Sequence, residues 1–107
     1  MPDKRKTQHI SAILEQAIAH KTIIQFTYKG FIRIVQPYLY GVLKNGHVAL
    51  SSYQTEGQSK SNTIPSWKTF SVDKMTHISI SSQQFTPRSD YNPLDKQFDQ
   101  VFASVKK

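Results

Sequence analysis

One arginine stands inside an apolar run, where a charged group needs a partner. Arg33 lies between Phe31 and Val35, and strand alternation would place all three side chains on the same face. A charge on an apolar face requires a counter-charge or a ligand, and the flat guanidinium fork matches a phosphate group. Arg33 is therefore a candidate anion-binding residue. The structural alternative is an ordinary edge-strand arginine paired with Asp73.

Two lysines flank an aromatic residue further along the chain. Lys68 and Lys74 lie on either side of Phe70, and Trp67 precedes them. Such a mixture can follow a single-stranded nucleic-acid backbone while a ring stacks on a base. Alternatively, the two rings belong to the core and the lysines are only solvated. The core is the favoured interpretation for the rings.

A polar stretch, residues 54–66, adds hydroxyl, amide and backbone donors. Gly57 would allow close backbone approach to phosphate oxygens. The stretch does not have the Walker sequence, so an ordinary loop is the favoured interpretation. Together with the basic residues above and a lysine in the predicted turn at 44–46, this stretch completes one candidate set. The residues that we expect to bind an anionic ligand are Arg33, Lys44, Tyr53, Gln54, Ser59, Lys68 and Lys74.

Catalytic and metal chemistry find little support in the residue types. The absence of cysteine excludes a disulfide framework, a thiolate metal site and a cysteine nucleophile. The four histidines show no metal-ligand spacing. Neither a nucleophile elbow nor a pair of catalytic carboxylates is recognisable. We therefore expect a protein that binds without catalysing, and that needs no metal or cofactor.

The charge of the chain favours an anionic partner. The 107 residues suffice for one domain and carry a net charge of +7. Residues 21–74 hold seven of the 14 basic residues but two of the seven acidic ones. Nucleic acid, a nucleotide or an acidic protein would suit such a surface, although a solvated basic surface is the alternative. No apolar segment is long enough to span a membrane and no signal peptide is visible, which predicts a cytoplasmic protein.

These residues must be positioned by a helix and a series of short strands. Apolar spacing predicts a helix over residues 8–20 with Thr7 as its N-cap. Pro37 is expected to end a strand, because it lacks the backbone N–H. A terminal helix over 94–105 would cover the sheet or pack against a second copy, giving a homodimer. The expected strands are residues 23–28, 31–35, 38–43, 47–53, 67–72 and 76–80.

The order of these elements resembles the WYL domain of bacterial transcriptional regulators. The resemblance covers about residues 10–80 and depends on two motifs, Arg33-Ile-Val-Gln-Pro37-Tyr38 and Trp67-Lys-Thr-Phe70-Ser-Val-Asp73-Lys74-Met75. The name-giving Trp-Tyr-Leu is replaced by Val48-Ala49-Leu50, and Lys74 replaces an arginine of the family. Members of the family usually carry an N-terminal winged-helix DNA-binding domain, and we expect this chain to be a stand-alone, divergent member without one.

The resemblance implies a mainly β (α+β) fold, a small Sm-like antiparallel β-barrel with a helix at each end. It implies sensing of single-stranded nucleic acid or a nucleotide in transcriptional or defence regulation, with Arg33 and Lys74 at the ligand surface. The expected organisation is a flexible basic segment 1–9, a WYL-like domain 10–80 and a C-terminal extension 81–107. The alternative is a protein-interaction module that docks an acidic partner or a separate DNA-binding chain.

Overall fold

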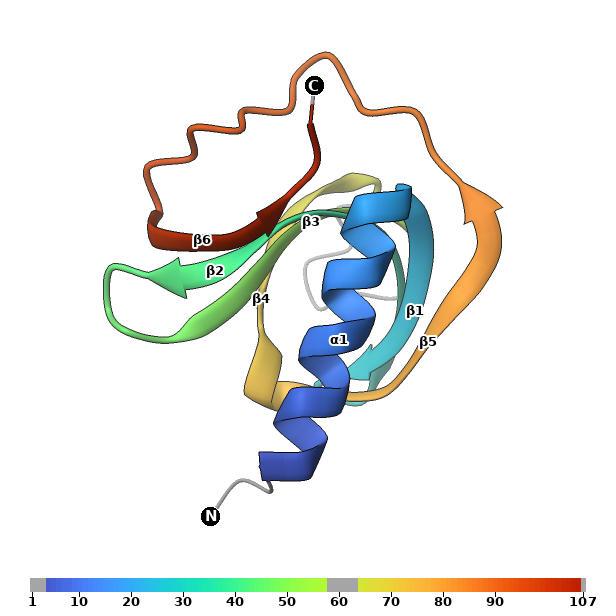
Figure 1. Ribbon diagram of the computed structural model, residues 1–107. Coiled ribbons are helices and arrows are strands. Elements are labelled where there is room, and N and C mark those ends of the chain that lie inside the picture. Colours follow the sequence, from blue (N-terminus) through green and yellow to red (C-terminus); the bar gives the residue numbers. More distant parts are fainter. Residues whose placement is uncertain (1–3, 58–63, 107) are drawn as a thin grey trace.

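A curled antiparallel sheet and one helix make up the fold. The computed structural model describes residues 4–57 and 64–106. The helix comes first in the chain and the strands follow it (Figure 1). The elements are α1 (Lys4–His20), β1 (Thr22–Tyr28), β2 (Phe31–Leu43), β3 (Val48–Gly57), β4 (Ser66–Ser71), the 3-10 turn η1 (Val72–Lys74), β5 (Met75–Gln84) and β6 (Phe98–Ser104).

The strands follow the order β4-β3-β2-β1-β5, and β6 pairs with the second half of β2. Every pairing is antiparallel, so the predominantly β fold with an N-terminal helix is confirmed. The expected closed barrel is not found, because β4 and β5 do not pair within the described residues. The short turn η1 joins the end of β4 to the start of β5. From there β5 pairs along its length with β1. The sheet therefore curls around α1 but stays open (Figure 1).

The apolar stripe of α1 packs into the concave face of the sheet. Ile10, Leu14 and Ile18 are almost fully buried, as their helical spacing predicts. On the sheet side, the ring of Phe26 meets that of Phe70 edge-to-face at 5.0 Å. The helix begins at Lys4 and not at residue 8, so Thr7 lies within it and is not the N-cap. Most of the segment 1–9 that we expected to be flexible is therefore helical.

Pro37 lies inside a strand, contrary to the sequence prediction. The single strand β2 runs through it, and the pairing with β3 shifts register between Pro37 and Leu39. On the other edge, β1 pairs with β2 as far as Val35, and β6 pairs with it from Leu39 onward. The missing N–H thus falls where β2 changes partner, a position at which proline is tolerated.

The expected C-terminal helix is wrong. Residues 94–105 contain β6, whose pairing with β2 carries register shifts that leave Asp99 and Phe102 as extra residues. Such bulges interrupt the two-residue alternation of a strand, so the apolar spacing imitates a helical period. Phe85, Tyr91 and Val105 are buried, so the segment 81–107 contributes to the same core as the rest of the chain.

The polar stretch 54–66 is only partly a loop. Its first residues, Gln54 to Gly57, continue β3, and Ser59 lies outside the described residues. Gly57 has a φ of +97°, and a Cβ there would meet the carbonyl oxygen of Ile32. The glycine thus allows β3 to approach β2 closely. No helix in the described part of the chain is long and apolar enough to cross a membrane.

Candidate functional site

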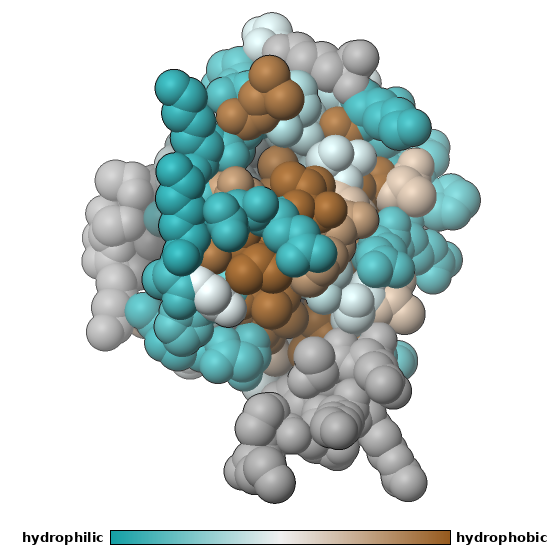
Figure 2. Space-filling view, turned by 60° about the vertical axis from the view of Figure 1, so that its left-hand side comes forward, coloured by the Kyte–Doolittle hydropathy of each residue, from teal (hydrophilic) through white to brown (hydrophobic). Residues whose placement is uncertain are grey.

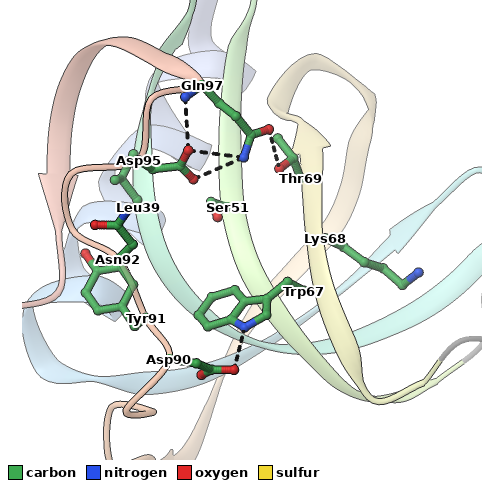
Figure 3. A pocket seen from close by; sticks show the side chains of 10 residues that line it. All are labelled: Leu39, Ser51, Trp67, Lys68, Thr69, Asp90, Tyr91, Asn92, Asp95 and Gln97. Atoms are coloured by element: carbon green, nitrogen blue, oxygen red, sulfur yellow. Dashed lines mark hydrogen bonds between the residues drawn. The ribbon is translucent and has the colours of Figure 1, made fainter.

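The residues that could hold a small ligand surround a cleft of about 400 Å³. One wall is β4, and the opposite wall is the irregular segment that leads into β6 (Figure 3). Leu39 and Ser51, from β2 and β3, form the floor. The lining residues are Leu39, Ser51, Trp67, Lys68, Thr69, Asp90, Tyr91, Asn92, Asp95 and Gln97.

Aromatic rings from both walls meet at one end of the cleft (Figure 3). The rings of Trp67 and Tyr91 are stacked with centroids 6.3 Å apart and an interplanar angle of 23°. Behind them, the buried ring of Tyr38 lies 4.8 Å from Trp67 and 4.7 Å from Tyr91. Tyr53 meets Trp67 edge-to-face at 5.4 Å. Because each ring is held by others, this end of the cleft is already in place before any ligand arrives.

An ion pair fixes the orientation of the indole. The Trp67 Nε1–H donates to Asp90 Oδ2 at 3.1 Å, and Arg88 Nε donates to Asp90 Oδ1 at 2.9 Å. The guanidinium of Arg88 also lies 4.0 Å from the ring centroid of Tyr53. The hydrogen bond from Arg88, followed by that from Trp67, lowers the pKa of Asp90. Asp90 therefore stays ionised at neutral pH and keeps the indole in one position.

The other end of the cleft is polar (Figure 3). Asp95 accepts hydrogen bonds from the backbone N–H of Gln97 at 3.0 Å and from its side-chain Nε2 at 3.1 and 3.2 Å. Gln97 Oε1 in turn accepts from Thr69 Oγ1 at 3.4 Å. Lys68 extends from β4 away from the indole ring (Figure 3). The cleft thus offers carboxamide and carboxylate groups near the rings, and the ammonium of Lys68 points outward from the β4 wall.

Arg33 lies elsewhere, in the interior of the curled sheet, and only 5% of it is exposed. Its guanidinium donates to Gln54 Oε1 at 3.4 Å and to the Tyr28 carbonyl at 3.2 Å. The rings of Tyr28, Phe31 and Phe70 surround it at 5.5 to 5.7 Å. Burial lowers the pKa of Arg33, and its Nε has no hydrogen-bond partner among the described residues.

Comparison with known proteins shows a likeness in the fold. No protein-family model and no curated protein matches the chain. Among solved structures, proteasome accessory factor B/C (PafBC) of Arthrobacter aurescens superimposes with a TM-score of 0.58 at 22% sequence identity. The match covers 87% of this chain but 14% of PafBC. The chain shares its fold with that part of PafBC. At this identity the likeness extends no further than the fold.

The sequence-predicted site residues fall into separate places. Lys68 lines the cleft and Tyr53 packs against its indole wall. Arg33 and Gln54 bind each other in the interior. The two remaining described lysines of the set are exposed and lie apart, Lys44 in the β2–β3 turn and Lys74 in η1. The residues therefore do not form one anion-binding surface.

The structural alternative for Arg33 is also not what the structure shows. Within the described residues, Arg33 forms no ion pair with Asp73; its partners are Gln54 and the Tyr28 carbonyl. No group of three or more His, Cys, Asp and Glu side chains is placed to hold a metal ion within residues 4–57 and 64–106.

Most of the polar cleft residues were not predicted from the sequence. Arg88, Asp90, Tyr91 and Asn92 belong to a segment that has no apolar period, and Gln97 lies in the segment that was predicted as a helix. The available signal was a tyrosine between Asp90 and Asn92, two residue types that favour turns. An aromatic ring in a turn-rich segment needs a surface to cover, and here that surface is Trp67 and Tyr38.

Removing the side-chain acceptor of Arg33 should destabilise the fold. Gln54→Leu leaves a buried guanidinium with one fewer partner, so we expect the free energy of unfolding to fall by about 2 kcal/mol. Adding Arg33→Met replaces both polar partners with apolar groups and should recover most of that loss. Urea unfolding of the single and double variants measures both effects. Additive losses in the double variant would contradict this description of the pair.

Proposed function

We propose that this chain is a WYL-like sensing module of a regulatory protein, and that it binds a nucleotide or single-stranded nucleic acid without catalysing a reaction. The resemblance to WYL domains in the Arg33–Tyr38 and Trp67–Met75 motifs supports the assignment. A fold shared with part of PafBC, a WYL-domain-containing regulator, supports it independently.

The observation that carries the proposal is the combination of groups in the cleft. The partly exposed indole of Trp67 offers a ring face on which any base can stack, and the buried ring of Tyr91 supports it. At the opposite end of the cleft from Trp67, Gln97 supplies an amide and Asp95 a carboxylate, and Asn92 adds an amide beside Tyr91 (Figure 3). Amides and carboxylates are groups that hydrogen-bond base edges. A volume of about 400 Å³ is within the range of small-ligand sites.

The charges indicate which part of a nucleotide would enter. Asp90 is balanced by Arg88, but Asp95 brings a second carboxylate to the cleft lining, so a phosphate inside would be repelled. Lys68 belongs to the cleft lining, and its side chain extends outward from β4, away from the indole (Figure 3). The base therefore goes into the cleft and the phosphate stays outside, near Lys68 and the basic surface of a chain whose net charge is +7.

Trp67 is the only tryptophan of the chain, so its fluorescence reports directly on the cleft. Titration with a short single-stranded oligonucleotide should give saturable quenching, and the affinity should fall steeply between low and moderate salt. The same titration with adenosine monophosphate separates a nucleotide ligand from a strand. Unchanged fluorescence with both probes at micromolar protein would sink the proposal.

The lysine of the cleft lining should carry part of the salt dependence. Lys68→Ala is expected to weaken oligonucleotide binding and to reduce the slope of log affinity against log salt by about one, because one phosphate contact is lost. Lys29→Ala, a change in the β1–β2 turn outside the cleft lining, serves as the matched control and should leave that slope nearly unchanged. Equal slopes for Lys68→Ala and the unmodified chain would remove Lys68 from the site.

A further inference from the structure

A second surface, unrelated to the cleft, lies between α1 and β6. A groove of about 630 Å³ runs between the C-terminal part of the helix and the last strand. Its apolar residues are Ile18 and Ala19 from α1 and Val101, Phe102 and Ala103 from β6. Figure 2 shows apolar side chains gathered at the centre of this side of the molecule, with hydrophilic ones around them.

The bulge in β6 explains why this strand presents apolar side chains to solvent. Tyr40 pairs with Ala103 and Gly41 with Val101, so Phe102 is the extra residue. Bulges at sheet edges turn a side chain away from its regular direction. As a result Val101 and Phe102, neighbours in sequence, are 48% and 44% exposed and both line the groove.

The exposed ring is not loosely placed. Phe102 packs against the ring of Tyr40 with centroids 5.1 Å apart. The Tyr40 hydroxyl donates to Ser11 Oγ on α1 at 2.9 Å, which ties β2, the partner strand of β6, to the helix. On its outer edge β6 has no strand partner within the described residues. A rigid apolar patch beside an unpaired edge is a typical protein–protein contact surface.

The rim of the groove carries charges of both signs. Glu15 comes from α1, Lys21 directly follows the helix, and Lys106 follows β6. A two-fold axis through the groove would bring the acidic part of one copy against the basic part of the other. A nucleic acid or an acidic partner would pair with Lys21 and Lys106 but would bring like charge against Glu15, which only a partner with both signs avoids. The charge pattern therefore favours a surface that complements itself.

We propose that a second copy of this chain docks on the groove between α1 and β6, forming a two-fold symmetric dimer. Phe102 and Val101 of each copy cover the apolar floor of the other. Glu15 of one copy faces Lys21 and Lys106 of the other. The cleft beside Trp67 does not share any of these residues, so both copies keep it open.

Sedimentation velocity of the full chain over a micromolar concentration series tests the dimer. The unmodified chain should reach the mass of a dimer, and Phe102→Asp should raise the dimer dissociation constant at least about tenfold, because a charge enters the apolar contact. Ile32→Asp, a change at an apolar residue 52% exposed on β2, should leave the dimer intact. A monomer at every concentration, or a dimer unaffected by Phe102→Asp, would overturn the proposal.

A charge exchange keeps the test independent of any effect of Phe102→Asp on folding. Glu15→Lys in one preparation and Lys21→Glu/Lys106→Glu in another should each impair self-association, because like charges then meet. Mixing the two preparations should restore a dimer containing one chain of each kind. Failure of the mixture to associate, when both variants keep the Trp67 fluorescence of the folded chain, would overturn the proposed orientation.

Discussion

Replacing Trp67 with alanine should weaken the binding of a labelled single-stranded oligonucleotide by on the order of tenfold to a hundredfold. Stacking on one aromatic side chain stabilises a bound base by about 1–3 kcal/mol, which corresponds to that range. Asp90 accepts a hydrogen bond from this indole and holds it in position. The ring of Tyr91 stacks against the indole. Fluorescence anisotropy of the oligonucleotide measures the loss without needing the tryptophan signal.

Two further variants separate stacking from a general loss of structure. Trp67→Phe keeps a ring face and should retain most of the affinity, although it loses the hydrogen bond to Asp90. Phe31→Ala removes a partly buried ring that does not line the cleft, so binding should change little. A loss with Phe31→Ala as large as that with Trp67→Ala would show that the effect comes from stability and not from stacking.

Replacing Gly41 with alanine should lower the free energy of unfolding by about 3 kcal/mol, the upper end of the usual cost of overpacking. A Cβ at this position would lie 2.1 Å from the Gln100 carbonyl oxygen and 3.0 Å from the Val101 Cα. Both are backbone atoms, so no side-chain rotation relieves the overlap. We therefore expect β6 to move away from β2, and urea unfolding to show the loss.

Gly46→Ala provides the matched control. Gly46 has a φ of +88° in the turn between β2 and β3, but a Cβ there has no neighbour within 4 Å. Its cost is conformational only and should be about 1 kcal/mol. A loss for Gly41→Ala no greater than for Gly46→Ala would contradict the close approach of β6 to β2.

Local patterns were sufficient to predict the parts of the fold that depend on neighbouring residues. The apolar stripe of α1 and the β1–β2 hairpin around Lys29-Gly30 follow from spacing and turn chemistry. The terminal strand β6 was predicted as a helix, because its bulges at Asp99 and Phe102 replace strand alternation with irregular spacing. Bulges depend on the partner strand, which local spacing does not reveal.

The site depended on contacts between distant segments, and its prediction was correspondingly partial. Lys68 was predicted as a site residue and Trp67 was favoured as a core ring. Asp90, the residue that orients the indole, lies in another segment without a regular pattern. The position of Arg33 on a buried face followed from strand alternation. Its partners, a neutral Gln54 and three aromatic rings, did not follow from charge pairing.

The central claim is that a base stacks in the cleft beside Trp67, and a nuclear magnetic resonance titration of the isotope-labelled chain tests it most directly. The single indole N–H signal belongs to Trp67, and the backbone amides of Thr69, Asn92 and Gln97 mark the other sides of the cleft. On addition of adenosine monophosphate or a short single-stranded oligonucleotide, we predict that these four signals shift together and saturate. Shifts confined to the β1–β2 turn or to η1, with the indole signal unmoved, would contradict the proposed site.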